Sequence, residues 1–308
     1  MRFAVALLAA AIPSTAAPSE VRVGGLFQRS SIKWARYAAA VMAVDEINSR
    51  SDLLAETTLR YAVKDSACSA GYALVGAHEL IQTSFSGTGV AALIGATCSG
   101  GSAAAAGYAA LYEVPQLSPS STSAALSDSS AYPYFARTAP SDAWQSFALA
   151  DLVQNVVASA FVATVSSEDT YGSTGMQEFL NEAQRRKLVV LGSTSFANGQ
   201  TEFAEQIDVL RRSGARVFVI FCQGADAKAF IKAAQAEGVG GQNFTWVGSE
   251  AATQAVSEDS ELEAALLGYA GLGPSAGTSN EFEQVRCSSS LCSLCSLCCP
   301  PQRQFQAL

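Results

Sequence analysis

The sequence predicts an α/β protein built from two doubly wound lobes, each with a parallel sheet covered by helices. Short apolar runs alternate with helical stretches along most of the chain, which is the pattern of repeated strand–helix units. The alternation restarts after Pro140, which indicates a second lobe. With 308 residues, of which 49% are hydrophobic, the chain is long and apolar enough for two cores.

The N-terminal segment predicts export. Arg2 precedes the apolar run FAVALLAAAI and the small residues STAA, so residues 1–17 are interpreted as a signal peptide. A membrane anchor is the alternative, but the apolar run is shorter than the ~20 residues that span a bilayer. The formal net charge of −8 argues against a nucleic-acid partner.

The first lobe is expected over residues 18–141. Its apolar runs are short and bounded by polar segments, as in buried parallel strands. Strands are expected at 21–27, 58–65, 90–95 and 114–119, and helices around 38–48 and 70–85.

The second lobe is expected over residues 142–272. Pro140 disfavours a helix through Ala139 and so marks the change of lobe. Apolar residues at helical spacing separate the apolar runs, beginning with Met176, Phe179 and Ala183. Strands are expected at 161–167, 188–196, 216–222 and 244–249.

The C-terminal part departs from this pattern. Residues 273–286 are rich in Gly, Pro and Ser and are interpreted as a crossing or linker. Residues 287–308 hold five of the eight cysteines and no histidine. A zinc site is one interpretation, but the spacing matches no common ligand frame, so low-complexity sequence is favoured and no metal is expected.

Two hydroxyl-rich loops follow neighbouring strands of the first lobe. They are ATCSGGS, which contains Ser99, and SPSSTSAALSD, which contains Ser120 and Thr122. Ligands of open α/β sheets bind outside the carboxyl ends of the strands, and a helix N-terminus there offers free N–H donors. These loops therefore predict a site for a small anion, although a tight turn with a capping serine is an equal alternative for either loop alone.

Three further residues at strand ends supply groups for an ammonium. These are Asp142, Tyr171 and Glu250. Each alone is more often a helix cap or a surface residue, but their shared position facing one cleft favours an amino-acid site between the lobes. Neither a P-loop nor a G-x-G-x-x-G motif is present, so nucleotide phosphates are disfavoured.

No motif of an enzyme or of a cofactor site is present. Serines without a neighbouring base are not activated nucleophiles. The single histidine, His78, is expected in mid-helix as partly buried packing. We therefore expect a binding protein that needs no cofactor.

The ordered motifs resemble the extracellular ligand-binding region of class C G-protein-coupled receptors, which share the fold of type I periplasmic binding proteins. The motifs lie between residues 21 and 285 and include AVDEINSRSDLL, IGATCSGGS, YFARTAPSD and WVGSE. The resemblance implies a cleft that closes on a small ligand. It also implies dimerisation through the first lobe and a membrane domain beyond this chain.

The resemblance also implies roles for individual residues. Ser99 and Thr122 would bind the α-carboxylate of an amino acid, while Thr122, Asp142, Tyr171 and Glu250 would bind its α-ammonium. Asp142 favours an α-amino acid over γ-aminobutyrate, because the type-B GABA receptors lack that aspartate. Arg29, Lys33 and Trp34 are candidates for contacts with the ligand side chain.

The cysteines and the glycosylation sequon follow from export and from the resemblance. Cys68 and Cys98 are expected to form a disulfide, as their equivalents do in related receptors, whereas Cys222 ends an apolar run and is expected to be a buried free thiol. Asn243 begins a glycosylation sequon. The distal lysine of glutamate receptors and the returning strands of lobe 1 are missing, which keeps a soluble amino-acid-binding protein of the transport type as an alternative.

Overall fold

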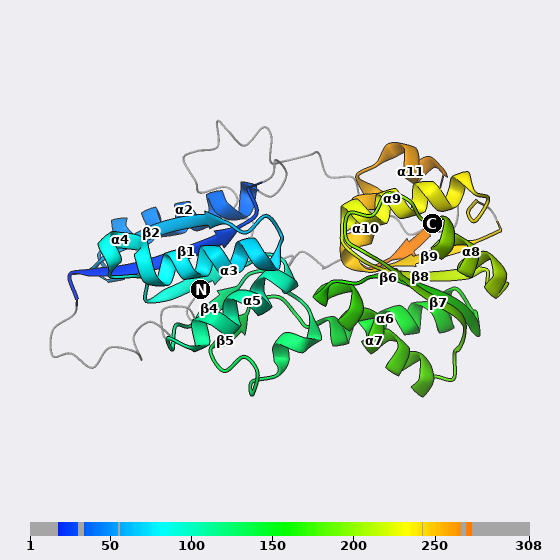
Figure 1. Cartoon of the computed structure of the whole chain (residues 1–308), viewed down its shortest axis with the longest axis horizontal. Coiled ribbons are helices and arrows are strands. Elements are labelled where there is room, and N and C mark those ends of the chain that lie inside the picture. The colour runs from blue at the N-terminus through cyan, green and yellow to red at the C-terminus, as the bar shows by residue number, and fades with distance from the viewer. Residues whose placement is uncertain (1–17, 30–33, 55, 242, 266–268, 273–308) are drawn as a thin grey trace. The chain divides into compact units, whose positions relative to one another are not determined.

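A computed structural model of the chain describes residues 18–272, apart from 30–33, 55, 242 and 266–268 (Figure 1). The expected signal peptide and the cysteine-rich C-terminal part lie outside the described residues. Among the described residues, no helix is long and apolar enough to cross a membrane.

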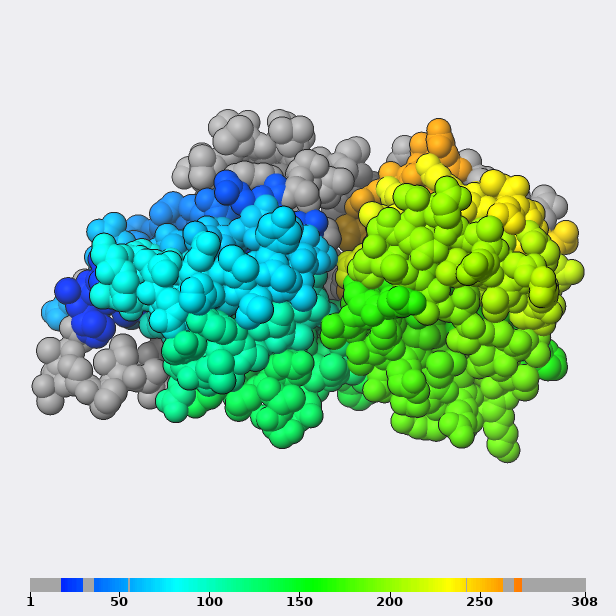
Figure 2. Space-filling view, in the orientation of Figure 1, coloured from blue at the N-terminus to red at the C-terminus, as the bar shows by residue number. Residues whose placement is uncertain are grey.

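Two parallel five-stranded sheets form the framework, as the sequence predicts. The first has the strand order β2-β1-β3-β4-β5 and the second β10-β9-β8-β6-β7. All ladders of both sheets are parallel. In the space-filling view, the first sheet and its helices are coloured blue to teal, and the second sheet and its helices green to orange (Figure 2).

The first lobe carries helices on both faces of its sheet. Its elements are β1 (Glu20–Phe27), α2 (Trp34–Ser49), β2 (Thr58–Asp65), α3 (Ala70–His78), α4 (Ser84–Gly87), β3 (Ala92–Gly95), α5 (Ser99–Ala110), β4 (Gln116–Ser118) and β5 (Phe135–Arg137). Helices α3 and α5 bury Leu26 and Leu93 on one face, whereas α2 packs on Val21, Val23 and Leu59 on the other.

The second lobe is more completely packed. Its elements are α6 (Asp142–Asp151), β6 (Phe161–Ser167), α7 (Thr170–Arg185), β7 (Val189–Phe196), α8 (Ala204–Ser213), β8 (Val217–Phe221), α9 (Gly224–Ala236), β9 (Thr245–Gly248), α10 (Glu250–Ser257), α11 (Ser260–Ala265) and β10 (Tyr269–Gly271). Helices α6 and α7 cover one face and α8 and α9 the other. Every residue of the central strand β8 is buried, which explains its uninterrupted apolar sequence.

Three sequence expectations about local structure need revision. The helix expected over 70–85 ends at His78, and a π-helical turn follows over Glu79–Thr83. The three-residue strands β5 and β10 were not expected, because so short a run carries no periodicity. His78 is exposed rather than partly buried. It is the last residue of α3, and its Nδ1 forms a hydrogen bond with Tyr108 Oη over 2.8 Å.

The two cysteine predictions for the described residues are confirmed. Cys68 and Cys98 form a disulfide that joins the loop after β2 to the residue preceding α5. Cys222 is free and fully buried at the end of β8. The disulfide holds the two neighbouring loops of the first lobe together beside the hydroxyl-rich turn.

Candidate functional site

The predicted site residues lie at the ends of strands, where the chain enters a helix. Ser99, Asp142 and Glu250 are the first residues of α5, α6 and α10, and Tyr171 is the second residue of α7. Ser120 and Thr122 lie in the loop that follows β4. Each residue therefore occupies the edge of a sheet at which open α/β proteins bind ligands.

The two hydroxyl-rich loops are tied to each other by hydrogen bonds. Ser99 is 2% exposed, and its Oγ accepts the N–H of Ser123 over 3.2 Å. The Ser120 hydroxyl donates to the carbonyl of Thr97 over 2.9 Å. The structure thus brings the two loops together, while the shared anion site stays a prediction.

Part of the hydroxyl content serves structure instead. The hydroxyls of Ser102, Ser118 and Ser121 all donate to the carbonyl of Ala96. In contrast, Thr97 Oγ1 is buried without a hydrogen-bond partner. Thr97 is a functional candidate that the sequence interpretation missed, because nothing in the sequence distinguishes it from its structural neighbours.

Asp142 is a buried carboxylate with one unpartnered oxygen. It is 1% exposed; its Oδ1 accepts a hydrogen bond from Gln145 over 2.8 Å, while its Oδ2 has no partner. Burial raises the pKa of Asp142 to about 7; Thr122, Gln145 and Arg137 oppose that rise, whereas Glu250 adds to it. The N-cap of α6 is Ser141, whose hydroxyl accepts the N–H of Ala143, so Asp142 is not needed as a cap.

Tyr171 and Glu250 surround the same carboxylate. Tyr171 is 3% exposed, and its hydroxyl forms no hydrogen bond. Burial raises the pKa of Tyr171 well above its ordinary value, and the charges of Asp142 and Glu250 raise it further. Burial also raises the pKa of Glu250, against the opposing charge of Arg36. Such mutual destabilisation of anions favours a cation among them.

Two arginines face this acidic group from the first lobe. Arg137 in β5 donates to the carbonyl of Ser123 over 2.6 Å and lowers the pKa of Asp142. Arg36 in α2 lowers the pKa of Glu250. The sequence interpretation considered Arg29, Lys33 and Trp34 from the same region. Lys33 and the Trp34 side chain lie outside the described residues.

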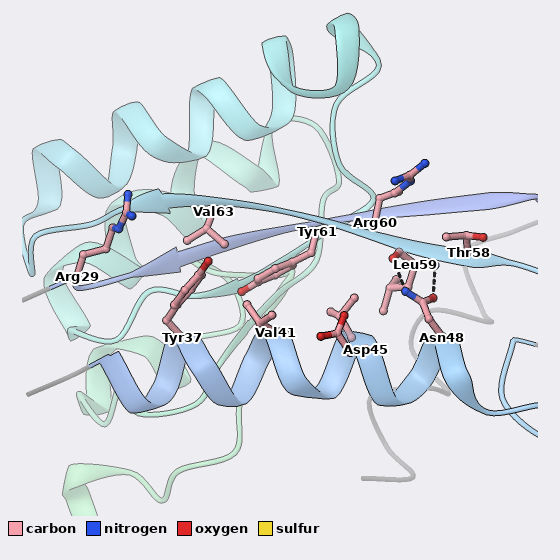
Figure 3. Close-up of a pocket in the computed structure, with 11 residues that line it drawn as sticks. Arg29, Tyr37, Val41, Asp45, Asn48, Thr58, Leu59, Arg60, Tyr61 and Val63 are labelled. Atoms are coloured by element: carbon pink, nitrogen blue, oxygen red, sulfur yellow. Dashed lines mark hydrogen bonds between the residues drawn. The ribbon is translucent and has the colours of Figure 1, made fainter. Parts of the chain in front are cut away.

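A cavity of about 570 Å³ lies elsewhere in the first lobe, between α2 and β2 (Figure 3). Arg29, Tyr37 and Tyr61 are among the residues that line it, and none of the six predicted site residues does. The Asn48 side chain closes one end by pairing with both the N–H and the carbonyl of Leu59. Because this cavity lies within one lobe, it is separate from the site described above.

No group of three or more metal-binding side chains occurs in the described part of the chain. The cysteine-rich tail, for which a zinc site is the disfavoured alternative, lies outside the described residues. Asn243 is exposed, as an acceptor of a glycan must be.

Comparison with known proteins decides the family. Residues 35–296 match the model of the receptor family ligand binding region. The chain belongs to this family. It is 29% identical over 263 residues to the extracellular calcium-sensing receptor of mouse, covering 80% of this chain and 24% of that protein. The human receptor of the same name is 30% identical over 229 residues, covering 69% of this chain and 21% of that protein.

The match confirms the resemblance to the extracellular ligand-binding region of class C receptors and the two-lobed fold that it implies. The family is one of receptor ligand-binding regions rather than of enzymes. The chain spans about a quarter of the length of the curated relatives that it matches.

Proposed function

We propose that this chain is the extracellular ligand-binding region of a class C receptor and that it binds an α-amino acid between its lobes without catalysing a reaction. The observation that carries this proposal is the set of buried polar atoms without partners around the strand ends. Of the nine such atoms among the described residues, four belong to the predicted site residues or to their near neighbours in sequence: Thr97 Oγ1, Asp142 Oδ2, Tyr171 Oη and Ser249 Oγ. Unpaired buried polar groups are costly, so their occurrence in several of the predicted ligand-binding loops supports a polar ligand there.

The first-lobe part of the set suits a carboxylate. Thr97 offers a hydroxyl donor, and the neighbouring Ser99 begins α5, whose first N–H groups have no intrahelical partners. The helix N-terminus also carries a partial positive charge. Ser120 and Thr122 supply further hydroxyls from the loop after β4.

The second part of the set suits an ammonium. Asp142 Oδ2 and Tyr171 Oη are open acceptors, and Glu250 adds a second negative charge. An ammonium among these groups would replace the mutual repulsion of the two carboxylates with two favourable interactions.

Entry of a ligand requires the lobes to open and close. Asp142 and Tyr171 are 1% and 3% exposed, so no ligand reaches them without movement. The lobes also contact each other here, because Ser123 Oγ of the first lobe donates to the carbonyl of Thr170 in the second over 3.3 Å. A ligand that binds both sets of groups would favour the closed arrangement.

The test is a thermal-shift and calorimetric screen of the L-amino acids against the parent protein and Asp142→Asn. We expect at least one amino acid to stabilise the parent, and the substitution to reduce its affinity by about 2–5 kcal/mol, as for one partner of a buried charge pair. Asp151→Asn, at the half-exposed end of the same helix, is the matched control and should bind normally. No binding by the parent, or equal binding by Asp142→Asn, would reject the proposal.

The alternative is a soluble amino-acid-binding protein of the transport type. The same fold and site would serve it, so binding data cannot separate the two. Sequencing of transcripts across the 3′ end would, because a receptor gene continues into a membrane domain.

We also propose that the receptor dimerises through the first lobe. A surface formed by α3, α5 and the turn after α5 is here called the α3/α5 face. It exposes Tyr72, Leu74, Val75, His78, Leu111 and Tyr112, together with half-buried Tyr108. Neither helix contains Asp, Glu, Lys or Arg. An uncharged apolar surface of this kind is typical of a protein interface.

A further inference from the structure

The side chain of Gln145 bridges two of the candidate ligand groups. Its Nε2 donates to Asp142 Oδ1 over 2.8 Å, and its Oε1 accepts the backbone N–H of Glu250 over 2.5 Å. The bridge joins α6 to α10 across 105 positions of sequence. Gln145 itself is half-buried, and both of its hydrogen bonds are partly buried.

The first of these bonds fixes how Asp142 is presented. With Oδ1 occupied by Gln145, only Oδ2 remains open, and that oxygen is buried without a partner. Oδ2 is therefore the carboxylate oxygen without a partner, and a second donor at Oδ1 would have to share that oxygen with Gln145. A guanidinium binds a carboxylate best through two parallel hydrogen bonds, whereas an ammonium needs one oxygen.

The second bond fixes the start of α10. The N-cap residue of that helix is Ser249, but its side chain makes no capping hydrogen bond, and its Oγ is buried without a partner. Gln145 Oε1 accepts the N–H of Glu250, the first residue of the helix. Ser249 Oγ lies beside the Tyr171 hydroxyl, and this proximity lowers the pKa of Tyr171.

We propose that Gln145 is a positioning residue. By holding Oδ1 of Asp142, it leaves Oδ2 as the only oxygen of this carboxylate without a protein partner. The site thereby favours ligands with an ammonium over ligands with a guanidinium. This inference rests on the proposed amino-acid site. It goes beyond that site by stating which class of cation Asp142 accepts. Gln145 controls this selectivity without needing to contact the ligand.

Removal of the bridge should relax that selectivity. Gln145→Met keeps the length and volume of the side chain but abolishes both hydrogen bonds, which leaves both oxygens of Asp142 open. Glycine and guanidinoacetate are suitable probes, because they share a carboxylate and differ in the cation. In the parent we expect glycine to bind about tenfold more tightly than guanidinoacetate, the scale expected of one well-placed charged hydrogen bond.

In Gln145→Met that ratio should fall to about threefold or less, because a guanidinium can then pair with both oxygens. Gln154→Met is the matched control: Gln154 lies farther along the same helical segment, is exposed, and donates to the carbonyl of Arg186. It should keep the parental ratio. Equal binding of the two probes by the parent, or an unchanged ratio in Gln145→Met, would overturn the proposal; an unchanged ratio would mean that size rather than hydrogen bonding excludes guanidinoacetate.

A ligand-free measurement separates failure of this inference from failure of the proposed function. Carbon-13 NMR titration of the Asp142 carboxyl, assigned by its loss in Asp142→Asn, reports the bridge directly. The bond from Gln145 lowers the pKa of Asp142, so Gln145→Met should raise that pKa. If the pKa rises but no amino acid of the screen binds to the parent, Gln145 positions Asp142 and the amino-acid proposal fails. An unchanged pKa refutes the positioning role, whatever binds.

Discussion

At the scale of one residue, Asp142 shows how a buried carboxyl of the candidate site lowers the stability of the ligand-free protein. Its carboxyl has an ordinary pKa of 3.8 and a pKa of about 7 in the folded protein. Between these values the folded state holds a proton that the unfolded chain has released. Stability is therefore lost as the pH rises through this window, by an upper bound of ~4 kcal/mol.

Asp142→Asn should accordingly stabilise the ligand-free protein, and more so at higher pH. Urea denaturation of the parent and the variant is the measurement. We expect the variant to unfold at higher urea than the parent at pH 8 and the difference to disappear near pH 4, where Asp142 is protonated in the folded state. A difference that does not change with pH would show that the Asp142 charge is already compensated.

The roles of some individual residues could not be predicted from the sequence. Strand ends are visible in a sequence, so Ser99, Asp142 and Glu250 could be placed at a sheet edge. Gln145 carries no such signal: its role depends on a contact with Glu250, which only the folded chain brings near. His78 was misplaced because a short helix that ends at a π-helical turn cannot be distinguished from a continuous one by periodicity.

At the scale of elements, apolar runs predicted the longer strands because a buried parallel strand needs apolar side chains on both faces. Strands β5 and β10 escaped prediction, since three residues at a sheet edge need no such pattern. The pairing of Cys68 with Cys98 came from the resemblance to receptors, as spacing alone permits many pairings.

That disulfide should support the hydroxyl-rich turn as well as the fold. It closes a loop with a sequence separation of 30, for which the chain-entropy model gives about 3–4 kcal/mol. The double variant Cys68→Ala/Cys98→Ala should lose about that much stability in urea. A reductant should destabilise the Cys222→Ala variant, which keeps the disulfide. It should not destabilise the double variant, which lacks the disulfide. A double variant within ~1 kcal/mol of the parent would contradict this account.

At the scale of the whole molecule, the two lobes differ in how their sheets are covered. Both faces of the second sheet carry large buried clusters. Among the described residues of the first lobe, the buried cluster that includes α3 and α5 has ten members, whereas the cluster under α2 has three. The α3/α5 helices are therefore the well-supported part of the first lobe, and a rigid support suits an interface.

Dimerisation through the α3/α5 face is the prediction that belongs to this scale. Val75 and Leu111 are 56% and 75% exposed. They lie one turn from His78 and Tyr108, whose side chains are hydrogen-bonded to each other. A glutamate at either position would place a buried charge in an apolar interface, and neither helix has a lysine or an arginine to pair with it.

Sedimentation velocity on the parent, Val75→Glu and Leu111→Glu tests this prediction. We expect a parental dimer that dissociates in both variants, while the ligand-free unfolding midpoint changes little because both side chains are exposed. Leu191→Glu is the matched control, since Leu191 is 41% exposed on the edge strand β7 of the second lobe. It should remain dimeric. Dimers that survive both substitutions would move the interface away from α3 and α5, and a monomeric parent would leave pairing with a different receptor chain as the use of this surface.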